Sequence, residues 1–277
     1  MSEAGGAAKR ARLDLALVEL GLARSRGQAR ELLATGGVLV NGIPAGKAST
    51  PVTDSDVVTV VAERARWVSR GADKMLAALA AFGPEGLMVA GRRALDVGAS
   101  TGGFTQVLVE HGAREVLALD VGHDQLAPTV AADPRVRDLS GRTVRDLAPT
   151  DLGGPVDLLV ADLSFISLTL VMPDLARVCR PDADLVLLVK PQFEVGRARL
   201  GKNGIVRSGA DRADAIRRVI TAAQDAGLSV CGLADSPVTG THGNREVLLW
   251  LQARPVVSGS WQALSERIDA LDAVKGG

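Results

Sequence analysis

The sequence predicts an α/β domain with a mostly parallel sheet, preceded by a small α+β unit. Two observations predict this division. From about residue 71 onward, short runs of Val, Leu and Ala alternate with helical stretches, as they do in α/β domains. Before that point the apolar residues form only short helical and strand patterns, and 277 residues exceed the roughly 250 of one ordinary domain. We therefore expect a small unit at 9–62, a linker at 63–70 and the α/β domain at 71–277.

The small unit begins with two predicted helices. Leucines at helical spacing indicate the first helix, and Gly21 can end it in a left-handed turn. Ser25 followed by Gln28 is a capping-box pattern for the second helix. Strands are expected at 38–40 and 57–62, the first of them leading into an Asn-Gly turn.

In the α/β domain, four apolar runs predict buried strands. They are residues 94–97, 116–120, 158–162 and 185–190. The carboxyl ends of parallel strands meet at one edge of a sheet, where proteins of this class collect their functional groups. We therefore expect the functional residues at that edge.

The composition is that of an ordinary folded protein. Apolar residues make up 47% and charged residues 23%, which allows a sizeable core. Lys and Arg number 32, as do Asp and Glu, so any nucleic-acid binding must rest on local charge.

The same composition excludes several classes of protein. Two cysteines and three histidines, without metal-ligand spacing, give no disulfide scaffold and no metal site, and they fit a reducing cytoplasm. The longest apolar runs are far too short for a membrane span. We therefore expect a cytoplasmic protein without membrane or metal partners. A monomer is compatible with the sequence, which leaves the oligomeric state open.

A glycine-rich loop follows the first predicted strand of the domain and opens a helix. Residues 95–104 read Leu-Asp-Val-Gly-Ala-Ser-Thr-Gly-Gly-Phe. Glycines let the backbone approach a ligand, and a helix N-terminus offers unpaired N–H donors. The loop lacks the lysine of a P-loop and breaks the dinucleotide-binding spacing. What remains is the form used by S-adenosylmethionine-dependent methyltransferases, with a ligand-free strand-to-helix turn as the alternative.

Asp120 supports a nucleoside ligand. It ends the next strand, 24 residues after Asp96, where a carboxylate can accept both ribose hydroxyls. The cofactor is therefore expected to be S-adenosylmethionine. The predicted cofactor-binding residues are Asp96, Gly98, Ser100, Gly102, Gly103, Phe104 and Asp120.

Four charged residues stand at predicted element ends. Asp162 and Lys190 each end an apolar run, Glu246 directly precedes one, and Lys74 lies near the start of the domain's first helix. Each alone is best explained as a charge in a salt bridge. Together they fit methyl transfer to a ribose 2′-oxygen, which must become nucleophilic and lie in line with the methyl group.

The expected roles follow from that chemistry. A desolvated lysine can accept the hydroxyl proton or stabilise the developing alkoxide, while carboxylates fix the geometry of the lysines. We expect Lys190 to activate the hydroxyl, Asp162 to orient it, and Lys74 and Glu246 to tune the pair.

These motifs resemble those of a known enzyme family. Residues 96–106 are similar to the glycine-rich segment of FtsJ-like ribose 2′-O-methyltransferases, and Lys-Pro-Gln-Phe-Glu-Val-Gly at 190–196 is the most specific block. Across 9–252 the chain resembles the bacterial TlyA family of rRNA cytidine 2′-O-methyltransferases, some of which are labelled haemolysins. The resemblance implies a Rossmann-like methyltransferase domain, an N-terminal RNA-binding domain and rRNA in ribosomal subunits as substrate. It also implies the catalytic set Lys74, Asp162, Lys190 and Glu246, and the basic residues 9–12 resemble the type that modifies both 16S and 23S rRNA.

Basic residues cluster in the small unit. Residues 8–30 hold six basic side chains against two acidic ones. An RNA-binding protein concentrates positive charge in this way, and a solvated helix face is the alternative. Such side chains contact phosphates and position the enzyme rather than choose the base. The candidate RNA-binding residues are Arg10, Arg12, Arg24, Arg26, Lys47 and Arg66. Trp67 beside them is either a lid on the junction or a stacking surface.

Three other functions compete with this interpretation. A base methyltransferase is the runner-up, but Asp-Leu-Ser-Phe at 162–165 differs from the Pro-Pro-aromatic motif usual for amino-group methylation. A non-catalytic ribosome-assembly factor would not need all four charged positions. A haemolysin would need a segment able to enter a membrane, and the sequence has none of suitable length.

Overall fold

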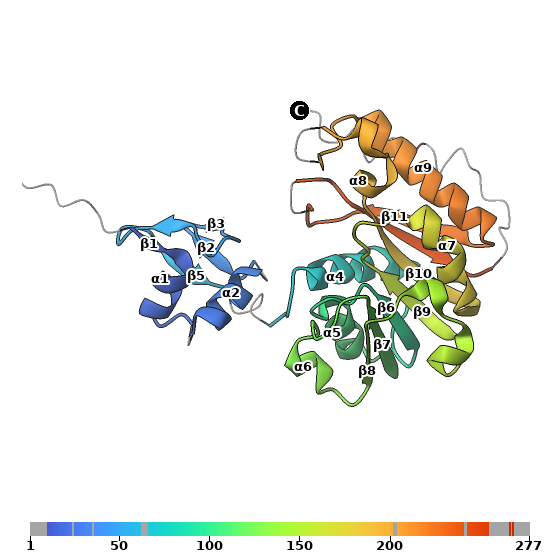
Figure 1. Ribbon diagram of the computed structural model, residues 1–277, viewed down its shortest axis with the longest axis horizontal. Helices are drawn as coiled ribbons and strands as arrows, with labels where there is room; N and C mark the ends of the chain where they lie inside the picture. The colour runs from blue at the N-terminus through green and yellow to red at the C-terminus, as the bar shows by residue number, and fades with distance from the viewer. Residues whose placement is uncertain are drawn as a thin grey trace, which may run out of the picture. The chain divides into compact units, whose positions relative to one another are not determined.

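The computed structural model describes residues 10–23, 25–34, 36–61, 66–201, 204–240 and 243–254, together with Glu266 and Ile268 (Figure 1). The chain divides between Arg70 and Gly71 into two compact units. Arg24, one of the predicted RNA-binding residues, lies outside the described residues, as do Lys9 and residues 62–65.

The N-terminal unit packs two helices against short antiparallel strands. Its elements are β1 (Ala11–Arg12), α1 (Leu13–Glu19), α2 (Arg26–Ala34), β2 (Val38–Val40), β3 (Ile43–Pro44), β4 (Pro51–Val52) and β5 (Val58–Val60). β2 lies between β3 and β5, and β1 pairs with β4. Leu13, Leu17 and Leu33 are buried between the helices and the strands.

The local predictions for this unit are confirmed. Gly21 follows α1 with a φ of +68°, in the left-handed region that favours glycine. The Ser25 hydroxyl oxygen accepts the backbone N–H of Gln28 at 3.2 Å, as a helix cap does. Asn41 and Gly42 both have positive φ, as the two central residues of a type I′ hairpin turn require.

The second unit is a seven-stranded sheet with helices on both faces (Figure 1). Its strands are β6 (Arg93–Val97), β7 (Glu115–Asp120), β8 (Val136–Ser140), β9 (Val156–Ala161), β10 (Cys179–Val189), β11 (Ser229–Asp235) and β12 (Val247–Gln252). Its α-helices are α4 (Gly71–Phe82), α5 (Gly103–Glu110), α6 (Pro128–Ala131), α7 (Leu168–Arg177), α8 (Pro191–Glu194) and α9 (Gly209–Asp225). Short 3-10 turns lie at Gly83–Glu85, Val144–Asp146, Pro149–Leu152 and Arg197–Arg199.

The strand order is β11-β12-β10-β9-β6-β7-β8. β8, β7, β6, β9 and β10 are parallel to one another, and β12 runs antiparallel to both β10 and β11. The predicted mostly parallel α/β sheet is thereby confirmed.

Alternation along the strands assigns the helices to the two faces. Leu95, Leu117 and Leu159 belong to the core that α7 and α9 cover. The opposite face meets α4 and α5, because Trp250 of β12 stacks on Phe82 of α4 and Asp96 of β6 bonds Thr105 of α5. Both faces are therefore buried, as a parallel sheet requires.

The antiparallel direction of β12 brings a further segment to the functional edge. Val189 at the end of β10 pairs with Val247 at the start of β12. Since β12 runs the opposite way, its first residue lies beside the carboxyl ends of the parallel strands. Glu246, which precedes β12, therefore arrives next to Lys190, which follows β10.

Candidate active site

Four charged side chains meet where β9 and β10 end and β12 begins. Lys74 reaches them from the first turn of α4. Its Nζ lies 3.1 Å from Asp162 Oδ2 and 2.9 Å from Glu246 Oε2. Lys190 Nζ lies 2.6 Å from Asp162 Oδ1. Charges of opposite sign therefore alternate from Glu246 through Lys74 and Asp162 to Lys190.

These four side chains, here called the charged chain, are largely withdrawn from water. Lys74 and Lys190 are 11% and 9% exposed, and Glu246 is 3% exposed. Two ammonium groups and two carboxylates carry no net charge, which makes their joint burial tolerable. Burial favours a raised pKa for Asp162, but the ammonium groups of Lys74 and Lys190 outweigh it and hold that pKa below its usual range. Asp162 is accordingly a carboxylate at neutral pH.

A hydroxyl continues the charged chain beyond Lys190. The Lys190 ammonium donates to Ser164 Oγ at 2.8 Å. Ser164 is exposed and stands two residues after Asp162 on the same loop. This contact could not be predicted from the position of Ser164 in the Asp-Leu-Ser-Phe segment.

Glu194 anchors the loop that carries Asp162 and Ser164. Its carboxylate accepts the backbone N–H of Leu168 at 2.8 Å and the hydroxyl of Ser167, which caps α7. Burial raises the pKa of Glu194, although these hydrogen bonds oppose the shift. The segment after Lys190 thus fixes the loop after β9, so the two sides of the site are held together.

A pocket of about 470 Å³ adjoins the charged chain. Gly98 and Ser100 of the glycine-rich loop, Asp120, Asp162 and Ser164 all line it. A Cβ at Gly98 would lie 2.9 Å from the Asp162 carbonyl oxygen, and the φ of Gly98 is +85°. Only glycine lets the loop pass this close to the end of β9. The volume is typical of a small-molecule site.

Asp120 ties the pocket wall together. Its two carboxylate oxygens accept the backbone N–H groups of Ser100 and Gly122, each at 2.8 Å. Each oxygen has a further lone pair available for a ligand hydroxyl. The pocket therefore fits a nucleoside-containing cofactor, with Gly98, Ser100 and Asp120 as the residues that can hold it.

The other four predicted cofactor residues are not among those that line the pocket. Gly102 has a φ of +92° and begins α5, where Gly103 and Phe104 are buried. Asp96 is fully buried and accepts the Thr105 hydroxyl at 2.6 Å. Burial raises the pKa of Asp96 to about 7. These residues support the conformation of the glycine-rich loop and do not line the pocket.

In the N-terminal unit, a buried carboxylate gathers the predicted RNA-binding arginines. Asp14 is fully buried, and its oxygens lie 3.0 Å from Arg12 Nε and 2.9 Å from Arg26 Nη2. Hydrogen bonds from Arg12 and Arg26 lower the pKa of Asp14 to about 2. Both arginine side chains remain about half exposed, at 48% and 52%.

The remaining candidates for RNA binding are exposed. Arg10, Lys47 and Arg66 all lie at the surface of their own unit. The Arg66 guanidinium stacks 4.9 Å from the centre of the Trp67 ring. Trp67 is half-buried.

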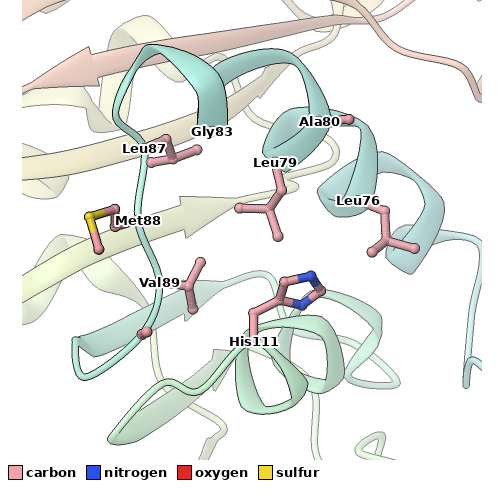
Figure 2. A pocket seen from close by; sticks show the side chains of 9 residues that line it. Leu76, Leu79, Ala80, Gly83, Leu87, Met88, Val89 and His111 are labelled. Atoms are coloured by element: carbon pink, nitrogen blue, oxygen red, sulfur yellow. The ribbon is translucent and has the colours of Figure 1, made fainter.

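A second pocket, of about 500 Å³, lies away from the charged chain (Figure 2). Leu76, Leu79 and Met88 give it an apolar wall, and His111 closes one side. The Nδ1 of His111 is hydrogen-bonded to the Val107 carbonyl at 2.8 Å. No residue of the charged chain lines this pocket.

The described residues include neither a membrane-spanning helix nor a cluster of metal ligands. No helix among them is both long enough and apolar enough to cross a membrane. Nor do three or more His, Cys, Asp or Glu side chains gather there as metal ligands would.

Comparison with known families accounts for both units. Residues 67–253 match the FtsJ-like methyltransferases, and residues 11–58 match the S4 domain. The fold and the matches define the class of the protein, a methyltransferase domain of the FtsJ type joined to an S4 domain.

Similar proteins span nearly the whole chain. It is 50% identical over 248 residues to "16S/23S rRNA (cytidine-2'-O)-methyltransferase TlyA" of Mycobacterium tuberculosis, covering 89% of this chain and 91% of that protein. It is 34% identical to "Hemolysin A" of Brachyspira hyodysenteriae, covering 86% and 98%. The solved structure "Putative hemolysin from Streptococcus thermophilus" superposes with a TM-score of 0.74 at 36% identity, covering 96% of each chain. The chain belongs to the TlyA family of FtsJ-like methyltransferases, as the resemblance predicted.

Proposed function

We propose that the protein transfers a methyl group from S-adenosylmethionine to cytidine 2′-hydroxyls in 16S and/or 23S rRNA, within ribosomal subunits in the cytoplasm. The observation that carries this proposal is the charged chain, which ends in Lys190 beside the pocket of Gly98 and Asp120. The cytidine substrate is supported by the name of the 50% identical mycobacterial relative.

The pocket residues supply the cofactor's contacts in this proposal. S-adenosylmethionine supplies, when bound, a methyl group made electrophilic by its positively charged sulfur. The Asp120 carboxylate would accept the ribose hydroxyls of its adenosine half, and the glycine-rich loop would contact the cofactor near Gly98. The conformation of that loop is supported by four residues that do not line the pocket: Asp96, Gly102, Gly103 and Phe104.

The charged chain prepares the substrate hydroxyl. As the ribose oxygen attacks, an O–C bond forms, a C–S bond breaks, and the hydroxyl proton leaves. If Lys190 has first released a proton to solvent, its neutral amine takes the hydroxyl proton. As an ammonium, Lys190 hydrogen-bonds the oxygen and stabilises the negative charge on it, while the hydroxyl proton passes to water. Asp162 lines the pocket and orients both partners, and Lys74 with Glu246 fixes Asp162 from its buried side.

The S4 unit supplies RNA binding in the same proposal. Residues 9–62 form the RNA-binding domain, 63–70 the linker and 71–277 the catalytic domain. Arg10, Arg12, Arg24, Arg26, Lys47 and Arg66 contact rRNA phosphates. Because phosphate contacts carry no base information, they place the enzyme on a structured site and leave nucleotide choice to the catalytic domain.

Mass mapping of methylated nucleosides tests the proposal. Purified protein is incubated with radiolabelled S-adenosylmethionine and with unmethylated small or large ribosomal subunits. We expect label in 2′-O-methylcytidine of at least one subunit. A methyl group on a base would instead identify a base methyltransferase, and no transfer to either subunit would identify a non-catalytic binding protein.

A further inference from the structure

Ser164 contacts the charged chain and lines the cofactor pocket, and the mechanism above gives it no role. Its Oγ is 2.8 Å from Lys190 Nζ, and it lines the cofactor pocket while its residue is exposed. Lys190, by contrast, is almost fully buried. The Ser164 hydroxyl therefore links the buried Lys190 ammonium to the solvent-exposed side of the pocket.

The two lysines differ in their partners. Lys74 lies between two carboxylates, Asp162 and Glu246. Lys190 has one carboxylate partner, Asp162, and its second contact is the neutral Ser164 hydroxyl. An ammonium has three N–H donors, so these two contacts leave Lys190 one donor for a further oxygen.

We propose that Ser164 is a positioning residue: together with Asp162, its hydroxyl holds the Lys190 ammonium so that the remaining N–H is directed at the place that the substrate's ribose 2′-hydroxyl takes. This inference rests on the proposed function, because the incoming hydroxyl is that of the methylated ribose. Glu194 supports the arrangement by anchoring the Ser164 loop to the helix that follows Lys190.

The proposal predicts a separation of kcat from KM. Without the Ser164 hydroxyl, Lys190 loses one of the two contacts that orient it, so the chemical step slows. In this arrangement Ser164 acts on Lys190 and not on the RNA, so RNA binding does not weaken. For Ser164→Ala we expect kcat to fall about 3- to 10-fold, the equivalent of one hydrogen bond, with KM for ribosomal subunits unchanged or lower.

Two variants complete the experiment. Ser164→Thr keeps a hydroxyl and should restore most of kcat. Ser208→Ala is the control, since it removes an exposed hydroxyl that caps α9 by accepting the backbone N–H of Asp211 and contacts neither Lys190 nor Glu194. We expect this control to lower the melting temperature without reproducing the pattern of low kcat and unchanged KM.

The outcomes separate this inference from the proposed function. If wild-type protein makes no 2′-O-methylcytidine, the proposed function fails. If the wild type is active and Ser164→Ala keeps the wild-type kcat, or loses kcat only together with a raised KM that Ser164→Thr does not restore, the positioning role of Ser164 fails alone.

Discussion

Lys190 and Lys74 carry the same charge but have different surroundings, and this difference is the basis of the different roles that we propose for them. Lys74 is held between Asp162 and Glu246, whereas Lys190 stands at the end of the charged chain beside the pocket. In the proposed mechanism Lys74, between two carboxylates, supports the geometry, and Lys190, at the end of the charged chain, contacts the substrate oxygen. At the scale of single residues, the site is a row of opposite charges in which each member orients the next.

Replacement of Lys190 tests its role directly. We expect Lys190→Ala to reduce methyl transfer at least about 100-fold, because the group that handles the hydroxyl proton is lost. Cofactor affinity, measured by isothermal titration calorimetry, should stay within a few-fold, since Lys190 does not line the pocket. Lys190→Arg should not restore activity, because a planar guanidinium cannot replace a compact ammonium. Retained turnover in Lys190→Ala would remove its assigned role.

The raised pKa of Asp96 predicts that the stability of the fold depends on pH. Its folded pKa is raised to about 7, well above that of an exposed aspartate, so its protonated form stabilises the fold. This contribution is full below pH 4 and is lost as the pH rises to about 7. Asp96→Asn stays neutral and can still accept the Thr105 hydroxyl. The variant should therefore gain stability relative to wild type between pH 5 and 7, by at most about 1.4 kcal/mol per pH unit.

Urea unfolding of wild type and Asp96→Asn at pH 5, 6, 7 and 8 measures this difference. The gain should level off above pH 7, where wild-type Asp96 is ionised in both states. A difference that stays constant across the series would contradict a protonated Asp96 in the folded protein.

At the scale of elements, the glycine-rich loop owes its place to one close approach. Gly98 has a positive φ, and an added Cβ would press on the carbonyl of Asp162. Gly98→Ala should therefore add backbone strain that lowers stability by about 1 kcal/mol or more, and it should disturb the alignment of Asp162 with the pocket. We expect at least a 10-fold loss of S-adenosylmethionine affinity.

Gly91→Ala is the matched control for this loop. Gly91 has a similar φ of +74°, but an added Cβ there meets no atom within 4 Å. Both variants should lose stability in thermal melts, Gly98→Ala more than Gly91→Ala because of the added contact, and only Gly98→Ala should lose cofactor affinity in calorimetry. Equal affinities in both variants would show that the approach of Gly98 to Asp162 has no part in binding.

The elements also show which features a sequence can predict. Four of the five parallel strands and the Asn-Gly hairpin were predictable, because apolar runs and turn residues are local signals, whereas β8 (Val136–Ser140) has no continuous apolar run. The direction of β12 was not, since a buried apolar run is the same in either direction, and this direction brings Glu246 to Lys190. The contact of Lys74 with Asp162 spans 88 residues and depends on where α4 packs. The resemblance to a family supplied these partners, and the contact of Lys190 with Ser164 had no signal in the sequence.

At the scale of the whole molecule, the two units differ in net charge. Residues 1–70 contain 10 basic and 7 acidic residues, and the remainder contains 22 and 25. A chain with no net charge therefore carries its excess of positive charge on the S4 unit, where Asp14 holds Arg12 and Arg26 on one surface. Affinity for RNA and the chemistry of methyl transfer should accordingly be separable by mutation.

A double variant of the S4 unit tests that separation. Arg26→Ala with Lys47→Ala removes two exposed cations that we propose to contact phosphate. Binding to ribosomal subunits should weaken at every salt concentration, and the slope of log affinity against log salt should decrease by about 1.5, because two fewer counterions are released. Calorimetry should show unchanged S-adenosylmethionine affinity. Arg180→Ala is the control, since Arg180 is exposed on the catalytic domain at the start of β10, the opposite end of the sheet from Lys190. If the double variant and Arg180→Ala keep the same slope, positive charge on the S4 unit does not direct the protein to RNA.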